Sequence, residues 1–173
     1  EKHLTTSTRA KRYVDYNSAK TILLIFESDY TEKNKYIREI IEQMTKDGKK
    51  VFAWGFLNKK MTSTAILPNF KILDQQTIDW LGCPKASFIN ELRENEYDLL
   101  IDLNRNDELT LRYVALHANA AFKTGMSCNS IGLFDFEIKL PEDDNKEKTD
   151  ESTKEKENYH NINDLLFHTD QQI

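Results

Sequence analysis

Continuous apolar runs and stretches of helical periodicity alternate along this chain. Residues 20–26, 50–57 and 97–103 are apolar runs of strand length, as expected for strands buried on both faces of a sheet. The segment between the first two runs carries apolar side chains at the spacing of one helix face: Tyr36, Ile37, Ile40, Ile41 and Met44. Gly48 suits the position just past the end of this helix. The short joints predict a strand–helix–strand unit whose two strands are parallel.

The alternation continues beyond this unit. The other predicted elements, in chain order, are a short strand (69–73), a helix (85–95), a helix after the third apolar run (107–119) and two strands (120–126 and 133–140). Asp107 is the expected N-cap of the second of these helices. The last strand alternates apolar and polar positions, which is typical of a sheet edge. The predicted fold class is α/β: a single three-layer Rossmann-like domain with a mostly parallel five- to six-stranded sheet and helices on both faces.

Charge is concentrated near the end of the chain. Residues 141–161 hold eight acidic and four basic side chains, whereas the rest of the chain holds 21 acidic and 20 basic ones. A segment this charged and this poor in aromatic and aliphatic side chains is expected to be mobile. We therefore divide the chain into a basic N-terminal segment (1–19), an α/β core domain (20–140), a charged mobile linker (141–161) and a C-terminal helix that packs on the core (162–173).

Composition limits the possible partners and compartment. The nearly neutral body argues against nucleic acid as a partner, because such binding needs a clustered basic face. The basic N-terminal segment is interpreted as a solvated tail or helix, with contact to an anionic surface as the alternative. No apolar run reaches the length of a membrane span. Two cysteines, Cys83 and Cys128, form neither a disulfide framework nor a zinc spacing, so we expect a reduced, cytoplasmic protein.

Polar residues at predicted strand ends are the candidates for a binding site. In an open parallel sheet, ligands bind beyond the carboxyl ends of the strands. On this basis Glu27, Asp29, Asp102 and Asn104 are the predicted ligand-binding residues. The turn "FESDYTEK" has no glycine and places two carboxylates where a phosphate would sit, which argues against a dinucleotide or phosphate cradle.

Several other kinds of chemistry are less well supported. Asp102 lies 75 residues after Glu27, and Lys123 follows it by only 21, which does not fit a phospho-accepting receiver domain. Cys83 has no histidine at a diagnostic spacing and is interpreted as a small half-buried turn residue. Glu27, Asp29 and Asp102 resemble a magnesium or calcium ligand set, but we interpret them as turn residues. We therefore predict no catalytic residue, no metal site and no cofactor.

The aromatic residues of the run at 50–57 have two interpretations. Phe52, Trp54 and Phe56 share one face of their strand because side chains alternate along it. Together with Trp80 they suggest a stacking platform for a base or a sugar. We favour the alternative, in which the strand's aromatic face is core packed against a helix.

Two resemblances to known families stand beside these patterns. The pieces "YDLLIDL", "NRND", "ELTLRYVALHANA" and "AFKTG" locally resemble the N-terminal, acceptor-side half of heptosyltransferase-like glycosyltransferases. The pieces "AKTILLIF", "KDGKKVFAWGFLNKK", "LGCPKASFINELRENEYDLLIDLN", "LTLRYVALHANAAFKTGM" and "FDFEI" resemble, in order, an uncharacterised bacterial family of small α/β proteins, a domain of unknown function. The second resemblance implies an α/β sheet domain and brings no assigned activity.

No complete catalytic constellation emerges, so we favour a non-enzymatic α/β domain that binds a partner or small ligand at the carboxyl ends of its strands. The alternative is a degenerate or minimal sugar- or nucleotide-handling enzyme that uses Glu27, Asp29, Asp102 and Asn104. A third hypothesis is an interaction subunit that docks through its basic N-terminal segment.

Overall fold

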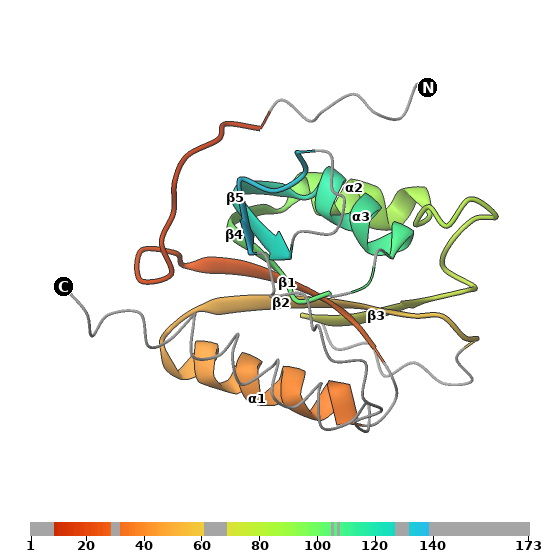
Figure 1. Cartoon of the computed structure of the whole chain (residues 1–173), viewed down its shortest axis with the longest axis horizontal. Helices are drawn as coiled ribbons and strands as arrows, with labels where there is room; N and C mark the ends of the chain where they lie inside the picture. Colours follow the sequence, from red (N-terminus) through yellow and green to blue (C-terminus); the bar gives the residue numbers. More distant parts are fainter. Residues whose placement is uncertain are drawn as a thin grey trace, which may run out of the picture. The chain divides into compact units, whose positions relative to one another are not determined.

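The computed structural model describes residues 9–28, 32–60, 69–104, 106, 108–126 and 132–138. All of them belong to the first of the two units into which the chain divides, Glu1–Lys139 and Leu140–Ile173. The elements in chain order (Figure 1) are β1 (Thr21–Glu27), α1 (Glu32–Lys46), β2 (Lys50–Leu57), β3 (Phe70–Asp74), α2 (Ala86–Glu94), β4 (Glu96–Asp102), α3 (Leu109–His117), β5 (Asn119–Met126) and β6 (Phe136–Ile138). The predicted charged linker and C-terminal helix lie outside the described residues.

The six strands form one sheet in the order β3-β2-β1-β4-β5-β6, and every neighbouring pair is parallel. The chain runs outward from β1 through β2 and β3, and it then crosses to the other side of β1 to form β4. Helix α1 covers one face of the sheet, and α2 and α3 cover the other (Figure 1). The predicted fold class is confirmed, and the sheet is parallel throughout.

Helix α1 is amphipathic and is terminated by a glycine just past its end, as predicted. Ile40 and Met44 are buried because residues four apart share one face of a helix. Gly48 has a φ of 78°, the left-handed conformation that costs least for glycine. The amides of Gly48 and Lys49 donate to the carbonyls of Thr45 and Met44 at 2.9 and 3.0 Å. This Schellman pattern satisfies the last helical carbonyls and returns the chain directly into β2.

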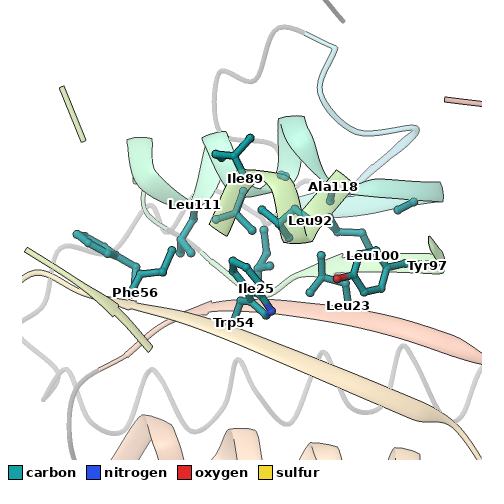
Figure 2. Packing of buried hydrophobic residues seen from close by; sticks show 14 residues of the cluster. Leu23, Ile25, Trp54, Phe56, Ile89, Leu92, Tyr97, Leu100, Leu111 and Ala118 are labelled. Atoms are coloured by element: carbon teal, nitrogen blue, oxygen red, sulfur yellow. The ribbon is translucent and has the colours of Figure 1, made fainter. Parts of the chain in front are cut away.

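The main core lies between the sheet and the layer formed by α2 and α3. The Trp54 side chain is 1% exposed, and its ring meets that of Phe88 edge-on at 6.1 Å between centroids. Phe56 belongs to the same cluster and Phe52 packs against it. Figure 2 shows side chains of the helices, such as Leu92, facing those of the strands. The aromatic face of β2 is therefore core, as we interpreted it, and not a platform for a ligand.

The N-terminal segment lies along the outer edge of β5. The Arg9 guanidinium donates to the carbonyls of Ala120 and Ala121 at 3.0 and 2.9 Å, and it pairs with Asp135 at 2.5 Å. The amide of Arg12 also donates to the carbonyl of Ala121, at 3.2 Å. Strand β6 pairs only with the end of β5, so these contacts satisfy edge carbonyls upstream of it. The Arg9 side chain is 6% exposed, whereas the side chains of Lys11 and Arg12 are each 66% exposed. The described part of this segment is therefore largely solvated, as interpreted, but it contains no helix and is anchored to the sheet through Arg9.

Helix α3 has a different cap from the one predicted. Its N-cap is Glu108, whose side chain accepts a hydrogen bond from the amide of Thr110. The predicted cap, Asp107, lies outside the described residues. The helix ends at His117, and Asn119, the predicted last helical residue, is already the first residue of β5. Asp107 and Glu108 are consecutive in the sequence, so the cap is a carboxylate, as predicted, although it lies one residue further on.

Candidate functional site

The strand order places a topological switch point between β1 and β4. From β1 the chain leads outward on one side, and from β4 it leads outward on the other. Ligands of open parallel sheets bind at such a point, beyond the carboxyl ends of the strands. Glu27 is the last residue of β1, Asp102 is the last residue of β4, and Asn104 follows two residues later. Three of the four predicted ligand-binding residues therefore lie at the switch point, and the fourth, Asp29, is outside the described residues.

A chain of hydrogen bonds links the ends of these two strands. The Asp102 carboxylate accepts from the amide of Asn104 at 2.8 Å. The side-chain amide of Asn104 donates to the carbonyl of Asn106 at 2.6 Å, and the side-chain amide of Asn106 donates to the Glu27 carboxylate at 2.8 Å. Asn106 therefore connects Glu27 to the turn that holds Asp102 and Asn104. We use the name switch-point cluster for Glu27, Asp102, Asn104 and Asn106.

Asn106 was not among the predicted site residues, although the sequence carries a local signal for it. Asp102, Asn104 and Asn106 are spaced by two residues. Side chains of Asp and Asn readily bond the backbone two residues further on, and the contact from Asp102 to Asn104 is of this kind. The spacing therefore predicts a turn built from side-chain contacts. It does not predict that Asn106 reaches Glu27, because that contact joins residues far apart in the sequence.

Asp102 has an unusual electrostatic environment for a carboxyl group. Burial raises its pKa from 3.8 to about 7, and the hydrogen bond from the Asn104 amide offsets only part of this effect. No lysine or arginine of the described residues pairs with it. Some of its surface still reaches solvent, since the residue as a whole is only partly buried. Asp102 is therefore a carboxyl group with a pKa raised toward neutral pH at the carboxyl end of a central strand.

Polar residues at the neighbouring strand ends make local contacts. The Ser28 amide donates to the carbonyl of Phe56 at 2.8 Å, and its hydroxyl donates to the side-chain oxygen of Asn34 at 2.9 Å. Asp74 ends β3, which lies two strands away from β1, and its carboxylate accepts from the amide of Gln76 at 3.0 Å. Ser28 thus ties β1 to α1, and Asp74 shapes the turn after β3. Neither has a hydrogen bond to Asp102.

Lys123 does not complement Asp102. It lies on β5, where its Cα pairs with that of Leu100 on β4. Its ammonium group donates to the carbonyls of Ala115 and Leu116 at 2.5 and 3.3 Å, at the end of α3. Burial, and to a smaller extent the charge of Arg9, lowers the pKa of Lys123 to about 7. Because the ammonium group bonds to the end of α3, Lys123 does not form with Asp102 the Asp–Lys pair of a receiver domain.

The described residues give little support to a nucleophilic cysteine or to a metal site. The Cys83 thiol is partly buried, and burial followed by the charge of Asp79 raises its pKa, which disfavours the nucleophilic thiolate. Cys128 lies outside the described residues. Within the described ranges, no group of three His, Cys, Asp or Glu side chains is placed to hold a metal ion.

Comparison with known proteins identifies the family. A model of a family of unknown function, DUF6913, matches residues 1–155 of the chain. The chain belongs to DUF6913. No curated protein and no solved structure matches it. The predicted resemblance to a family of unknown function is thus confirmed, and the local resemblance to heptosyltransferase-like enzymes stays a prediction.

The match to DUF6913 spans every residue that the structure describes. The parallel sheet and the switch-point cluster therefore both lie within the part of the chain that the family model covers. In those described parts of this DUF6913 protein, no helix combines the length and the apolar character needed to cross a membrane.

Proposed function

We propose that this DUF6913 protein is a non-enzymatic α/β domain that binds a small polar ligand at the carboxyl ends of β1 and β4. The observation that carries the proposal is the convergence of Glu27 and Asp102 at the switch point, where Asn104 and Asn106 link them. Side chains at a switch point are close to one another without belonging to the hydrophobic core. A position of this kind is where an α/β sheet commonly holds its ligand.

The chemistry of the cluster favours a ligand that donates hydrogen bonds. An ionised carboxylate is only an acceptor, and the ligand groups that suit it are hydroxyls and ammonium groups. Glu27 supplies such an oxygen, and Asp102 supplies another when it is ionised. A phosphate is disfavoured because the turn after β1 has no glycine and Glu27 ends that strand, so negative charge would meet negative charge. We expect a neutral polyol or sugar, or an amine.

A second candidate, a minimal sugar- or nucleotide-handling enzyme, rests on one observation. A carboxyl group with a pKa near 7 suits general acid–base catalysis at neutral pH, and Asp102 has such a pKa. Catalysis would also need a second group at the reacting centre, and the switch-point cluster adds only Glu27 and two amides. Binding without turnover is therefore our leading proposal.

A thermal-shift screen of the purified full chain tests the proposal. The compounds are neutral sugars, polyols, amines, sugar phosphates, inorganic phosphate and nucleotide sugars. A ligand at about 100 times its dissociation constant adds roughly 2.7 kcal/mol, or about 5–10 °C in Tm for a chain of this size. We expect a shift with a neutral or amine compound that is lost in Asp102→Asn and in Glu27→Gln. Glu94→Gln, on the exposed end of α2, is the matched control and should keep the shift.

Each other result has a distinct meaning. A shift that survives both Asp102→Asn and Glu27→Gln places the ligand elsewhere. A shift with phosphates alone contradicts the predicted ligand class. Turnover of a sugar or nucleotide substrate that disappears in Asp102→Asn supports the enzyme. No shift with any compound argues against a small-molecule ligand of these classes.

A further inference from the structure

The hairpin that joins β3 to α2 presents an exposed tryptophan on a tightly bonded turn. The Asp79 carboxylate accepts from the amides of Leu81 and Cys83 at 2.8 and 2.9 Å, and the Asp79 amide donates to the carbonyl of Cys83 at 2.9 Å. The turn is thus held on both sides of Trp80. Nevertheless the Trp80 side chain is 90% exposed, more than any other large apolar side chain in the described residues.

The hairpin is also fixed to helix α3. The Thr110 hydroxyl donates to the carbonyl of Gly82 at 2.9 Å. Leu109 lies beside the same glycine, since a Cβ on Gly82 would be 3.6 Å from a Leu109 methyl carbon. Leu81 and Leu109 are each 49% exposed. We use the name hairpin surface for Trp80, Leu81 and Leu109.

A rigid, exposed tryptophan suits recognition of another molecule. Tryptophan removes a large apolar area from water when it is buried, and it is enriched among the residues that dominate binding energy. Ordering a mobile loop on binding would oppose association, but the hydrogen bonds around Trp80 have already ordered this turn. The hairpin surface therefore combines an exposed apolar side chain with a backbone that is already ordered, which are the two properties of a preorganised anchor.

The size of the hairpin surface argues against a second copy of the chain as its occupant. Three side chains of this size and exposure present at most roughly 400 Å², whereas each partner in a stable dimer buries about 800 Å². A short segment of another protein matches the smaller area.

The charges beside the hairpin surface indicate the character of that segment. Asp79 directly precedes Trp80, and Glu108 directly precedes Leu109. The exposed indole face of Trp80 also attracts cations. A segment that places an apolar side chain next to a lysine or arginine would match both the apolar surface and its acidic neighbours.

We propose that the hairpin surface docks a short segment of a partner protein in which apolar and basic side chains alternate. The hairpin surface shares no residue with the switch-point cluster, although the two are neighbours: the amide of Glu108, next to Leu109, donates to the carbonyl of Asn106 at 2.8 Å. The two proposals can therefore fail independently.

Fluorescence anisotropy of labelled peptides tests the docking proposal on the full chain. One probe is a short peptide of leucine and lysine, and its counterpart carries glutamate in place of lysine. We expect saturable binding of the leucine–lysine peptide, with affinity reduced at least about tenfold in Trp80→Ala. Tyr13→Ala is the matched control, because Tyr13 is a 77% exposed aromatic residue on the N-terminal segment. That variant should bind like the wild type.

The contrary results are equally specific. Equal affinity for the leucine–glutamate peptide, unchanged binding in Trp80→Ala, or no binding of either peptide would overturn the proposal. Dimerisation abolished by Trp80→Ala would do so too, by making a second copy the occupant. The ligand-induced thermal shift should persist in Trp80→Ala, so a failure here is distinguishable from a failure at the switch point.

Discussion

Two partly buried carboxyl groups, Asp135 before β6 and Asp102 at the end of β4, have opposite environments. Asp135 accepts from the Arg9 guanidinium and from the amide of Lys123, and Lys11 lies 3.3 Å from its other oxygen. Burial alone would raise the pKa of Asp135, but these partners outweigh it and hold the pKa below its usual value. Asp102 accepts from one backbone amide, and its pKa is raised to about 7.

Asp135 has a structural role, whereas the Asp102 carboxyl group is available to contact a ligand. The partners of Asp135 come from the N-terminal segment and from β5, so its charge joins distant parts of the chain. Asp102 lies at a strand end with unused acceptor capacity and no cationic partner among the described residues. A desolvated carboxyl group without a counter-ion costs stability, and groups with such perturbed pKa values are concentrated at functional sites.

The largest effect should come from breaking the Asp135 contacts. Asp135→Asn leaves the Arg9 guanidinium, which is 6% exposed, without its counter-ion, so we expect a loss of roughly 2–4 kcal/mol of unfolding free energy. Urea denaturation at neutral pH measures this. The double variant with Arg9→Met should lose less than the sum of the two single variants. A loss below about 0.5 kcal/mol would show that the contact is no more than a surface ion pair.

Replacing Asp102 by Asn should raise the free energy of unfolding, whereas the same replacement at Asp135 should lower it. The folded-state pKa of about 7 lies above the usual pKa of 3.8, so the folded protein binds more protons between these values. Stability attributable to Asp102 therefore falls as pH rises from 3.8 to 7. Asp102→Asn should be more stable than the wild type by about 1–3 kcal/mol at pH 7 and above, and similar to it near pH 4.

Thermal or urea denaturation across that pH range gives the test. A constant difference between the two proteins at all pH values would mean that Asp102 does not titrate in this window. A destabilised Asp102→Asn at pH 8 would show that its charge is paired after all.

Lys123 should make the free energy of unfolding depend on pH between about 7 and 10.5, with a smaller effect than that of Asp102. Its folded-state pKa of about 7 lies below the usual pKa of 10.5. The unfolded chain therefore binds more protons between these values, and stability rises with pH across that window. The carbonyls at the end of α3 still favour the ammonium group, so we expect a rise of about 1–2 kcal/mol. Lys123→Met should abolish the rise, whereas Asp102→Asn should leave it intact.

Substitution of Tyr97 should change the free energy of unfolding least among these variants. The Tyr97 hydroxyl is buried and has no hydrogen-bond partner among the residues that the structure describes. Because the Tyr97→Phe variant removes an unsatisfied polar group, it should gain up to about 1 kcal/mol in urea denaturation. Tyr16→Phe is the matched control, since that hydroxyl donates to Asp47 at 2.6 Å, and it should be neutral or slightly destabilised. A loss of stability in Tyr97→Phe would reveal a partner such as an ordered water.

Much of the fold could be predicted from local pattern. The predicted strand at 50–57 has the bounds of β2, and Gly48 lies just past the end of the helix after β1, as expected. The site was partly predictable for the same reason. Polar residues that directly follow an apolar run must lie at a strand end, which selected Glu27, Asp102 and Asn104. Asn106 was missed because its role depends on a contact with Glu27 across 79 residues of sequence.

The sequence by itself determined the elements, because a strand or a helix shows its period in the residues that form it. The order of the strands, the coverage of the β5 edge by Arg9, and the raised pKa of Asp102 were decided by the tertiary structure. Each of these depends on which distant segment lies beside a given residue, and on how much water that segment excludes. Burial and pairing are properties of the packed neighbourhood, and residues close in sequence supply only part of it.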